Sequence, residues 1–83
     1  MFHKIKDIKP LPDFRLLADF ENGEKREYDI SPLFEKWTAF RDLINTPGLF
    51  ELVKVDVGGY GISWNDCLDL SCDELYCNGI EIQ

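Results

Sequence analysis

Residues 14–30, which read FRLLADFENGEKREYDI, decide the fold of this chain. Apolar side chains recur at every second position from Phe14 to Phe20, which is the spacing that places them on one face of a β-strand. Asn22-Gly23 follows, and this pair favours a tight turn because both residues tolerate positive φ angles. The alternation resumes from Arg26 to Ile30. These features predict a β-hairpin.

The residues before the hairpin predict one more strand. His3 to Lys9 alternates apolar and charged residues and is followed by Pro10 and Pro12. Proline lacks the N–H that an inner strand needs, so we expect an edge strand that stops at Pro10 and Pro12.

The middle of the chain favours short helices. Ser31-Pro32 predicts an N-cap and a first helical residue, opening a helix over Leu33 to Lys36. A second piece is expected from Ala39 to Ile44, with Thr38 as its cap. Thr46-Pro47 repeats the cap-and-proline pattern and predicts a further helical turn.

The C-terminal part predicts a second hairpin and a capped helix. Lys54 to Val57 and Ile62 to Trp64 flank a glycine-rich loop at 58–61, and Trp64 is expected in the core. Ser71 and Glu74 match the capping box of a helix start. Asn78-Gly79 predicts a left-handed helix end, and Ile80 to Gln83 a last strand. Together the elements predict an α+β fold: a small, mainly antiparallel sheet of two hairpins and an edge strand, with short helices.

Length and composition favour one domain over residues 1–83. The chain has 83 residues and is 45% hydrophobic, enough for one folded core. A domain of this size buries only about 60% of the surface of its unfolded chain, so association into a homodimer is one route to added stability. No apolar run is long enough for a signal peptide or a membrane span, and we expect a cytoplasmic protein without a membrane partner.

Charge is distributed unevenly. The net charge is −7, and no Lys or Arg follows Lys54. An acidic surface repels phosphate backbones and attracts basic partners, so a basic protein is the expected partner and nucleic acid is disfavoured. The alternative is that these acids only keep the domain soluble.

Catalytic, metal and cofactor sites are not expected. Cys67, Cys72 and Cys77 have a C-x4-C-x4-C spacing that fits neither a zinc knuckle nor a redox pair, and we expect at least two of them to pack as small apolar groups. The glycine-rich loop leads into a strand and not into a helix, unlike a phosphate-binding loop. The single histidine, His3, has no nucleophile motif near it, so we predict that the protein is not an enzyme. A pocket of ~300 Å³ or more is not expected in so short a chain.

Six residues are candidates for a protein interface. Amphipathic aromatic residues serve as interface anchors, and two of them fall in a helix junction and a loop, where side chains are exposed. The others are acids that cluster between 66 and 74 and could instead serve only in capping and solvation. The candidates are Trp37, Tyr60, Asp66, Asp69, Asp73 and Glu74.

Three stretches resemble one small bacterial family, the domain of unknown function 2442. They are Lys9-Pro10-Leu11-Pro12-Asp13; Phe20-Glu21-Asn22-Gly23-Glu24 leading to Tyr28-Asp29-Ile30-Ser31-Pro32-Leu33; and Trp64-Asn65 leading to Asp69-Leu70 and Glu74-Leu75-Tyr76. Where the family usually has Asn-Gly after the tryptophan, this chain has Asn65-Asp66, so the turn there can differ. The resemblance implies an α+β domain with no assigned activity and no assigned functional residue.

Two functional hypotheses follow. The resemblance implies either a partner of a small, basic, toxin-like protein or the front half of a helix-turn-helix regulator, and we expect too little chain after Trp64 for the latter module. The preferred hypothesis is a non-enzymatic protein-interaction module, antitoxin-like or accessory to a basic protein. The alternative is a nucleic-acid-associated component of a transcriptional regulator, supported only by Lys4, Lys6, Lys9, Lys25 and Arg26.

Overall fold

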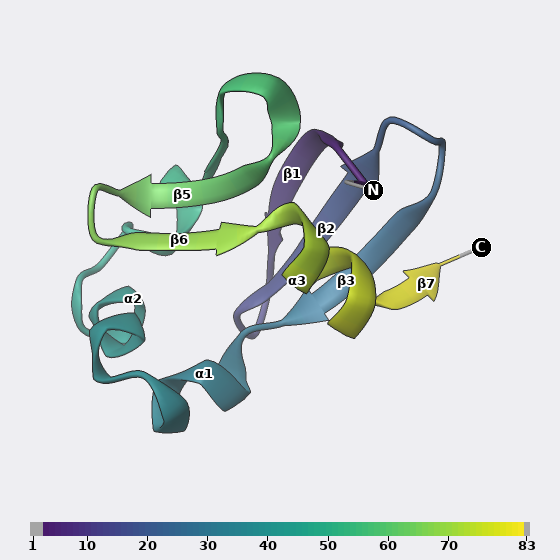
Figure 1. Ribbon diagram of the computed structural model, residues 1–83. Coiled ribbons are helices and arrows are strands. Elements are labelled where there is room, and N and C mark those ends of the chain that lie inside the picture. The colour runs from purple at the N-terminus through teal and green to yellow at the C-terminus, as the bar shows by residue number, and fades with distance from the viewer. Residues whose placement is uncertain (1–2, 83) are drawn as a thin grey trace.

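The computed structural model describes residues 3–82 and confirms the α+β class, with two antiparallel sheets (Figure 1). The first sheet has the strand order β1-β2-β3-β7 and the second β4-β5-β6. The strands are β1 Ile5–Leu11, β2 Arg15–Phe20, β3 Lys25–Asp29, β4 Lys54–Val55, β5 Gly61–Asn65, β6 Leu68–Ser71 and β7 Ile80–Ile82. The helices are α1 Ser31–Lys36, α2 Asp42–Asn45 and α3 Cys72–Asn78, with 3-10 turns η1 Thr38–Arg41, η2 Phe50–Leu52 and η3 Val57–Gly59.

The hairpin of β2 and β3 forms as predicted. Gly23 has a φ of +91°, and the Asn22 side chain accepts a hydrogen bond from the Glu24 N–H at 2.9 Å. On β2, Leu16, Ala18 and Phe20 are buried on the face that points to the core. The turn chemistry and the alternation therefore act together to fix the register.

β1 lies at the sheet edge, as expected, but it continues through Pro10 and ends just before Pro12. It runs to Leu11 and pairs with β2 through a three-residue turn, with Leu11 opposite Arg15. Asp13 and Phe14 in this turn have φ angles of +64° and +57°. The expected separate edge strand is thus one arm of a further hairpin, which lacked a glycine to signal its turn.

The middle of the chain is helical in short pieces, but the predicted caps were wrong. Ser31 is the first residue of α1, and its N–H donates to the Asp29 side chain at 2.9 Å. Thr38 begins η1 and is not its N-cap. The turn after Thr46-Pro47 leads to η2 only at Phe50.

The second sheet confirms the predicted hairpin and adds a strand. β4 pairs with β5, but Val57 lies in η3 and is 99% exposed, because Gly58 turns the chain with a φ of +84°. β6 was not predicted. It pairs with β5 across the turn at 65–67, where the Asn65 side chain accepts hydrogen bonds from the N–H groups of Cys67 and Leu68.

α3 starts with the predicted cap, since the Ser71 hydroxyl accepts from the Glu74 N–H at 3.1 Å. Its predicted left-handed end was wrong: Gly79 has φ −81° and ψ 157°. A glycine is needed there because a Cβ would collide with the Leu75 carbonyl oxygen and lie 3.1 Å from the Arg26 Cβ. The last strand, β7, pairs with β3, while the expected end at Gln83 lies outside the described residues.

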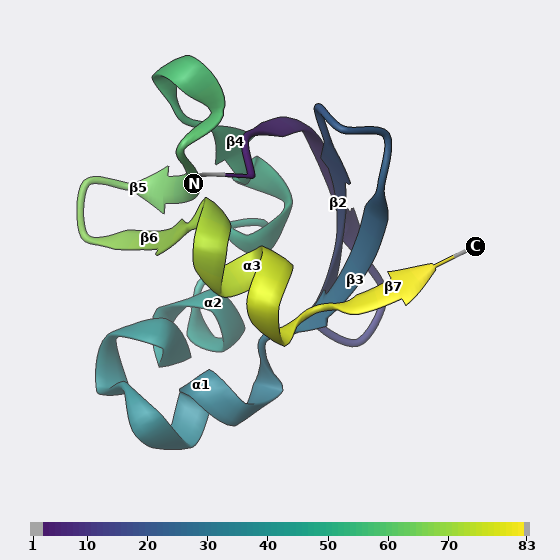
Figure 2. The same ribbon diagram turned by 45° about the vertical axis from the view of Figure 1, so that its right-hand side comes forward.

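The core fills the space on one side of the four-stranded sheet. The second sheet and the helices lie on that side, with α3 between β6 and β3, and no described element covers the opposite face of the four-stranded sheet, which we call the uncovered face (Figure 2). Trp64 is in the core as expected, and its Nε1 donates to the Phe50 carbonyl at 3.0 Å. Within residues 3–82, no helix has the length and apolar character needed to cross a membrane.

Candidate functional site

A groove runs between α1 with η1 on one side and β6 with α3 on the other; we call it the α1–α3 groove. It consists of two adjoining hollows of about 330 and 300 Å³ that share Leu33, Lys36 and Glu74. The first is also lined by Trp37, Phe40, Asp69, Leu70 and Ser71, and the second by Tyr28, Asp29, Pro32 and Asn78. Leu33 and Phe40 give it an apolar floor, since both are buried.

Trp37 stands at the groove because α1 ends there. Its backbone turns to the extended region, with φ −130° and ψ 111°, and its N–H donates to the Leu33 carbonyl at 2.8 Å. Trp37 is 54% exposed, and the Lys36 ammonium lies 6.0 Å from the centre of its ring. An exposed tryptophan held at a fixed helix end is suited to serve as a contact anchor.

Glu74 is held in place by two side-chain donors. The Tyr28 hydroxyl donates to its Oε2 at 2.7 Å, and the Asn78 amide donates to the same oxygen at 2.9 Å. Burial of the phenol, together with its hydrogen bond to Glu74, raises the pKa of Tyr28 well above its ordinary value. The carboxylate is therefore fixed at the first turn of α3, where the helix dipole also favours a negative charge.

Three of the six predicted interface residues line this groove, namely Trp37, Asp69 and Glu74. The other three lie elsewhere. Tyr60 is exposed beside η3, with the Lys4 ammonium 5.2 Å from its ring centre, and Asp66 is exposed in the turn between β5 and β6. Asp73 is half-buried on α3, with Cys72 Sγ 3.9 Å from its Oδ1. The predicted acidic cluster is therefore divided: Asp69 and Glu74 line the groove, whereas Asp66 and Asp73 do not.

Nine lining residues were not among the six candidates, and Tyr28, Asp29, Lys36 and Asn78 are the ones with large polar side chains. One sequence signal was available, because Asn78 stands four residues after Glu74 and such residues are neighbours on a helix. Nothing local indicates that β3 brings Tyr28 to α3, since Tyr28 and Glu74 are 46 positions apart.

The cysteines differ from expectation, and His3 packs against an aromatic ring. Only Cys72 is buried, and burial raises the pKa of its thiol; Cys67 and Cys77 are exposed, so the prediction that at least two would pack inside was wrong. The ring of His3 stacks on Tyr76 with centroids 3.5 Å apart. In the described part of the chain, no group of three or more His, Cys, Asp or Glu residues is arranged to hold a metal ion.

A further open hollow of about 410 Å³ lies beside the β1–β2 turn, lined by Pro10, Leu11, Pro12, Asp13, Phe14, Phe50 and Glu51. The expectation that the chain has no hollow of about 300 Å³ was therefore wrong. Phe14 is one of its lining residues, and its ring meets the rings of Phe34 and Phe50 edge-on, with centroids 5.4 and 5.3 Å apart.

Comparison with known proteins places the chain in a family. The model of the family described as "Protein of unknown function (DUF2442)" matches residues 5–81. No curated protein and no solved structure matches the chain. The matched range includes the seven strands described in residues 3–82, except the last residue of β7, and the three α-helices described there. The chain therefore belongs to the DUF2442 family.

Proposed function

We propose that this protein acts in the cytoplasm by binding a basic partner protein, without catalysis, and that the α1–α3 groove receives a cationic segment of the partner. One observation carries the proposal: the fold brings an exposed Trp37 to the same groove as Asp69 and the fixed carboxylate of Glu74. Asp29 is a third acidic residue in the lining of the groove. Lys36 is the basic residue in the same lining. An aromatic surface beside carboxylates fits a Lys or Arg side chain, through stacking and charge. An antitoxin-like role against a small basic protein is the specific form that we favour.

The alternative of nucleic-acid binding has weaker support. On the uncovered sheet face, Asp19 of β2 has Asp7 of β1 opposite it on one side and Lys25 of β3 on the other. Acidic side chains therefore lie beside the basic ones on this face. The Arg26 guanidinium donates to Glu24 and lies over the Tyr76 ring at 4.0 Å. A continuous basic surface, the usual footprint of phosphate-backbone binding, is not formed by these residues.

The test compares two charge reversals on one hairpin. Asp66 and Asp69 are both exposed acids of the β5–β6 hairpin, but only Asp69 lines the groove. We expect basic proteins from native extract to be retained by the wild type and by Asp66→Lys at low salt, and to be released as salt rises and screens the charges. Asp69→Lys is expected to lose them. Equal retention by the two variants, or retention that does not respond to salt, contradicts the proposal.

A further inference from the structure

β7 leaves one edge of the four-stranded sheet open. It is the last strand in the order β1-β2-β3-β7, and no strand among residues 3–82 pairs with its outer edge. Such an edge presents backbone N–H and C=O groups that can accept another strand. The strand at this edge also exposes apolar side chains, since Ile80 is 74% exposed and Ile82 is 40% exposed.

The register assigns each β7 side chain to a face. Ile80 is opposite Glu27 and Ile82 opposite Lys25, so the register places both isoleucines on the uncovered face of the sheet. Leu17 is opposite Glu27 and extends this row on the same face. Glu81 is opposite Arg26 and therefore lies on the other face.

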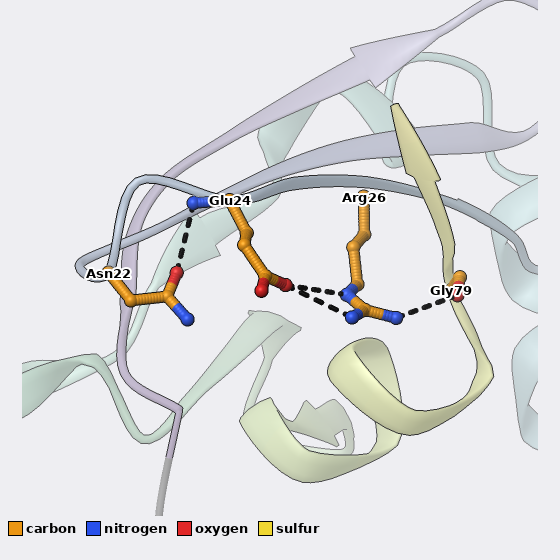
Figure 3. Close-up of polar contacts among 4 residues, drawn as sticks. All are labelled: Asn22, Glu24, Arg26 and Gly79. Carbon is orange, nitrogen blue, oxygen red and sulfur yellow. Dashed lines mark hydrogen bonds and ion pairs between the residues drawn. The ribbon is translucent and has the colours of Figure 1, made fainter. Parts of the chain in front are cut away.

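The Glu81 carboxylate has no partner among residues 3–82, although Arg26 is its cross-strand neighbour. Figure 3 shows why: the Arg26 guanidinium points toward Glu24 and Gly79. Its Nη2 donates to Glu24 Oε2 at 3.0 Å and its Nη1 to the Gly79 carbonyl at 3.4 Å. Glu81 thus carries an uncompensated charge at the open edge.

A second copy of the chain fits this edge poorly. Two β7 strands related by a two-fold axis through their centres place Glu81 directly opposite Glu81, and like charges in directly opposed positions are destabilising. Each copy also carries a net charge of −7. A three-residue strand has few other contacts to offset this repulsion.

We propose that the open edge of β7 binds an antiparallel strand of a basic partner with the pattern apolar–Lys/Arg–apolar. The two apolar side chains would lie against Ile80 and Ile82 on the uncovered face, and the cation would be opposite Glu81. This surface is separate from the α1–α3 groove, whose lining contains no β7 residue. The proposal therefore does not depend on the groove.

The test uses the full chain and two capped peptides, Thr-Ile-Lys-Ile-Lys-Ile-Thr and the same sequence with Glu in place of Lys. We expect the wild type to bind the Lys peptide at least ten-fold more tightly than the Glu peptide, with amide shifts in β7 and β3 observed by NMR. Glu81→Lys should reverse this preference, whereas Asp69→Lys, which alters only the groove, should keep it. N-methylation of alternate peptide residues should abolish binding, because it removes the donors of a new strand.

Three results would overturn the proposal. One is that the shifts map to α1 and β6, which would assign the peptide to the groove. Another is an unchanged preference in a Glu81→Lys variant whose circular dichroism matches the wild type. The third is a wild-type dimer in sedimentation that tightens in Glu81→Gln, since the occupant would then be a second copy.

Discussion

The contact between Tyr28 and Glu74 joins the four-stranded sheet to α3 through one short hydrogen bond of 2.7 Å. Tyr28 is buried and its hydroxyl is the donor, so the ring fills the core while its polar end holds a groove residue in place. A hydrogen bond to a charged acceptor contributes about 1.5–3 kcal/mol, more than a neutral one. The same residue therefore serves stability and the geometry of the groove.

We predict that Tyr28→Phe, which removes this hydrogen bond, lowers the free energy of unfolding by about 1.5–3 kcal/mol at pH 7. Because the folded-state pKa of Tyr28 is raised, the phenol's contribution is complete below its unfolded-state pKa of about 10 and is lost as pH rises above it. The difference between wild type and Tyr28→Phe should then shrink above pH 10. Urea unfolding at pH 7 and at about pH 11 measures it, and a constant difference would contradict the prediction.

At the scale of elements, the passage from α3 to β7 depends on a close approach and not on an unusual backbone angle. Gly79 lies in extended backbone, but the space its Cβ would occupy is taken by the Leu75 carbonyl and the Arg26 side chain. Gly48 is the opposite case, with a φ of +83° and no heavy atom within 4 Å of the position that a Cβ would take. Two glycines thus have different physical requirements.

We predict that Gly79→Ala costs about 2–3 kcal/mol through overcrowding, and that Gly48→Ala costs about 1 kcal/mol through the left-handed conformation. Asparagine separates the two causes, since it tolerates positive φ. Gly48→Asn should therefore be milder than Gly48→Ala, whereas Gly79→Asn should be at least as harmful as Gly79→Ala. Chemical denaturation of the four variants tests this, and equal effects of alanine and asparagine at both sites would contradict it.

At the scale of the whole molecule, one hydrophobic cluster includes side chains of both sheets. Phe20 and Tyr28 come from the first sheet, and Ile62, Trp64 and Leu68 from the second. Trp64 is buried at 5% exposure, and its ring meets those of Phe40 and Phe50. A core shared in this way couples the two sheets energetically.

We therefore predict that the chain unfolds as one cooperative unit. Trp37→Phe leaves Trp64 as the single tryptophan, so fluorescence then reports on the core. Its urea transition should coincide with that of far-UV circular dichroism, as expected for two-state unfolding. Separate transitions would show that the two sheets unfold independently.

How far the sequence could predict the fold depended on the range of each interaction. The β2–β3 hairpin and the Ser71 cap follow from residues a few positions apart, and both were predicted. The β1–β2 turn was missed because Asp13 and Phe14, and not glycine, adopt positive φ, which local sequence does not favour. The Phe14 carbonyl accepts from the Ile30 N–H at 3.1 Å, a long-range contact that helps to hold this turn.

Residues close together along the chain were enough to predict the fold class, the two signalled hairpins, the helix start at Ser71, the burial of Trp64 and the acidic C-terminal half, because periodicity, turn chemistry and charge are local properties. The shared lining of Trp37, Asp69 and Glu74 could be seen only in the folded chain, as could the pairing of β7 with β3 that leaves Glu81 unpaired among the described residues. These placements depend on packing between residues far apart along the chain. No local pattern specifies such contacts, since they form only when the whole core closes.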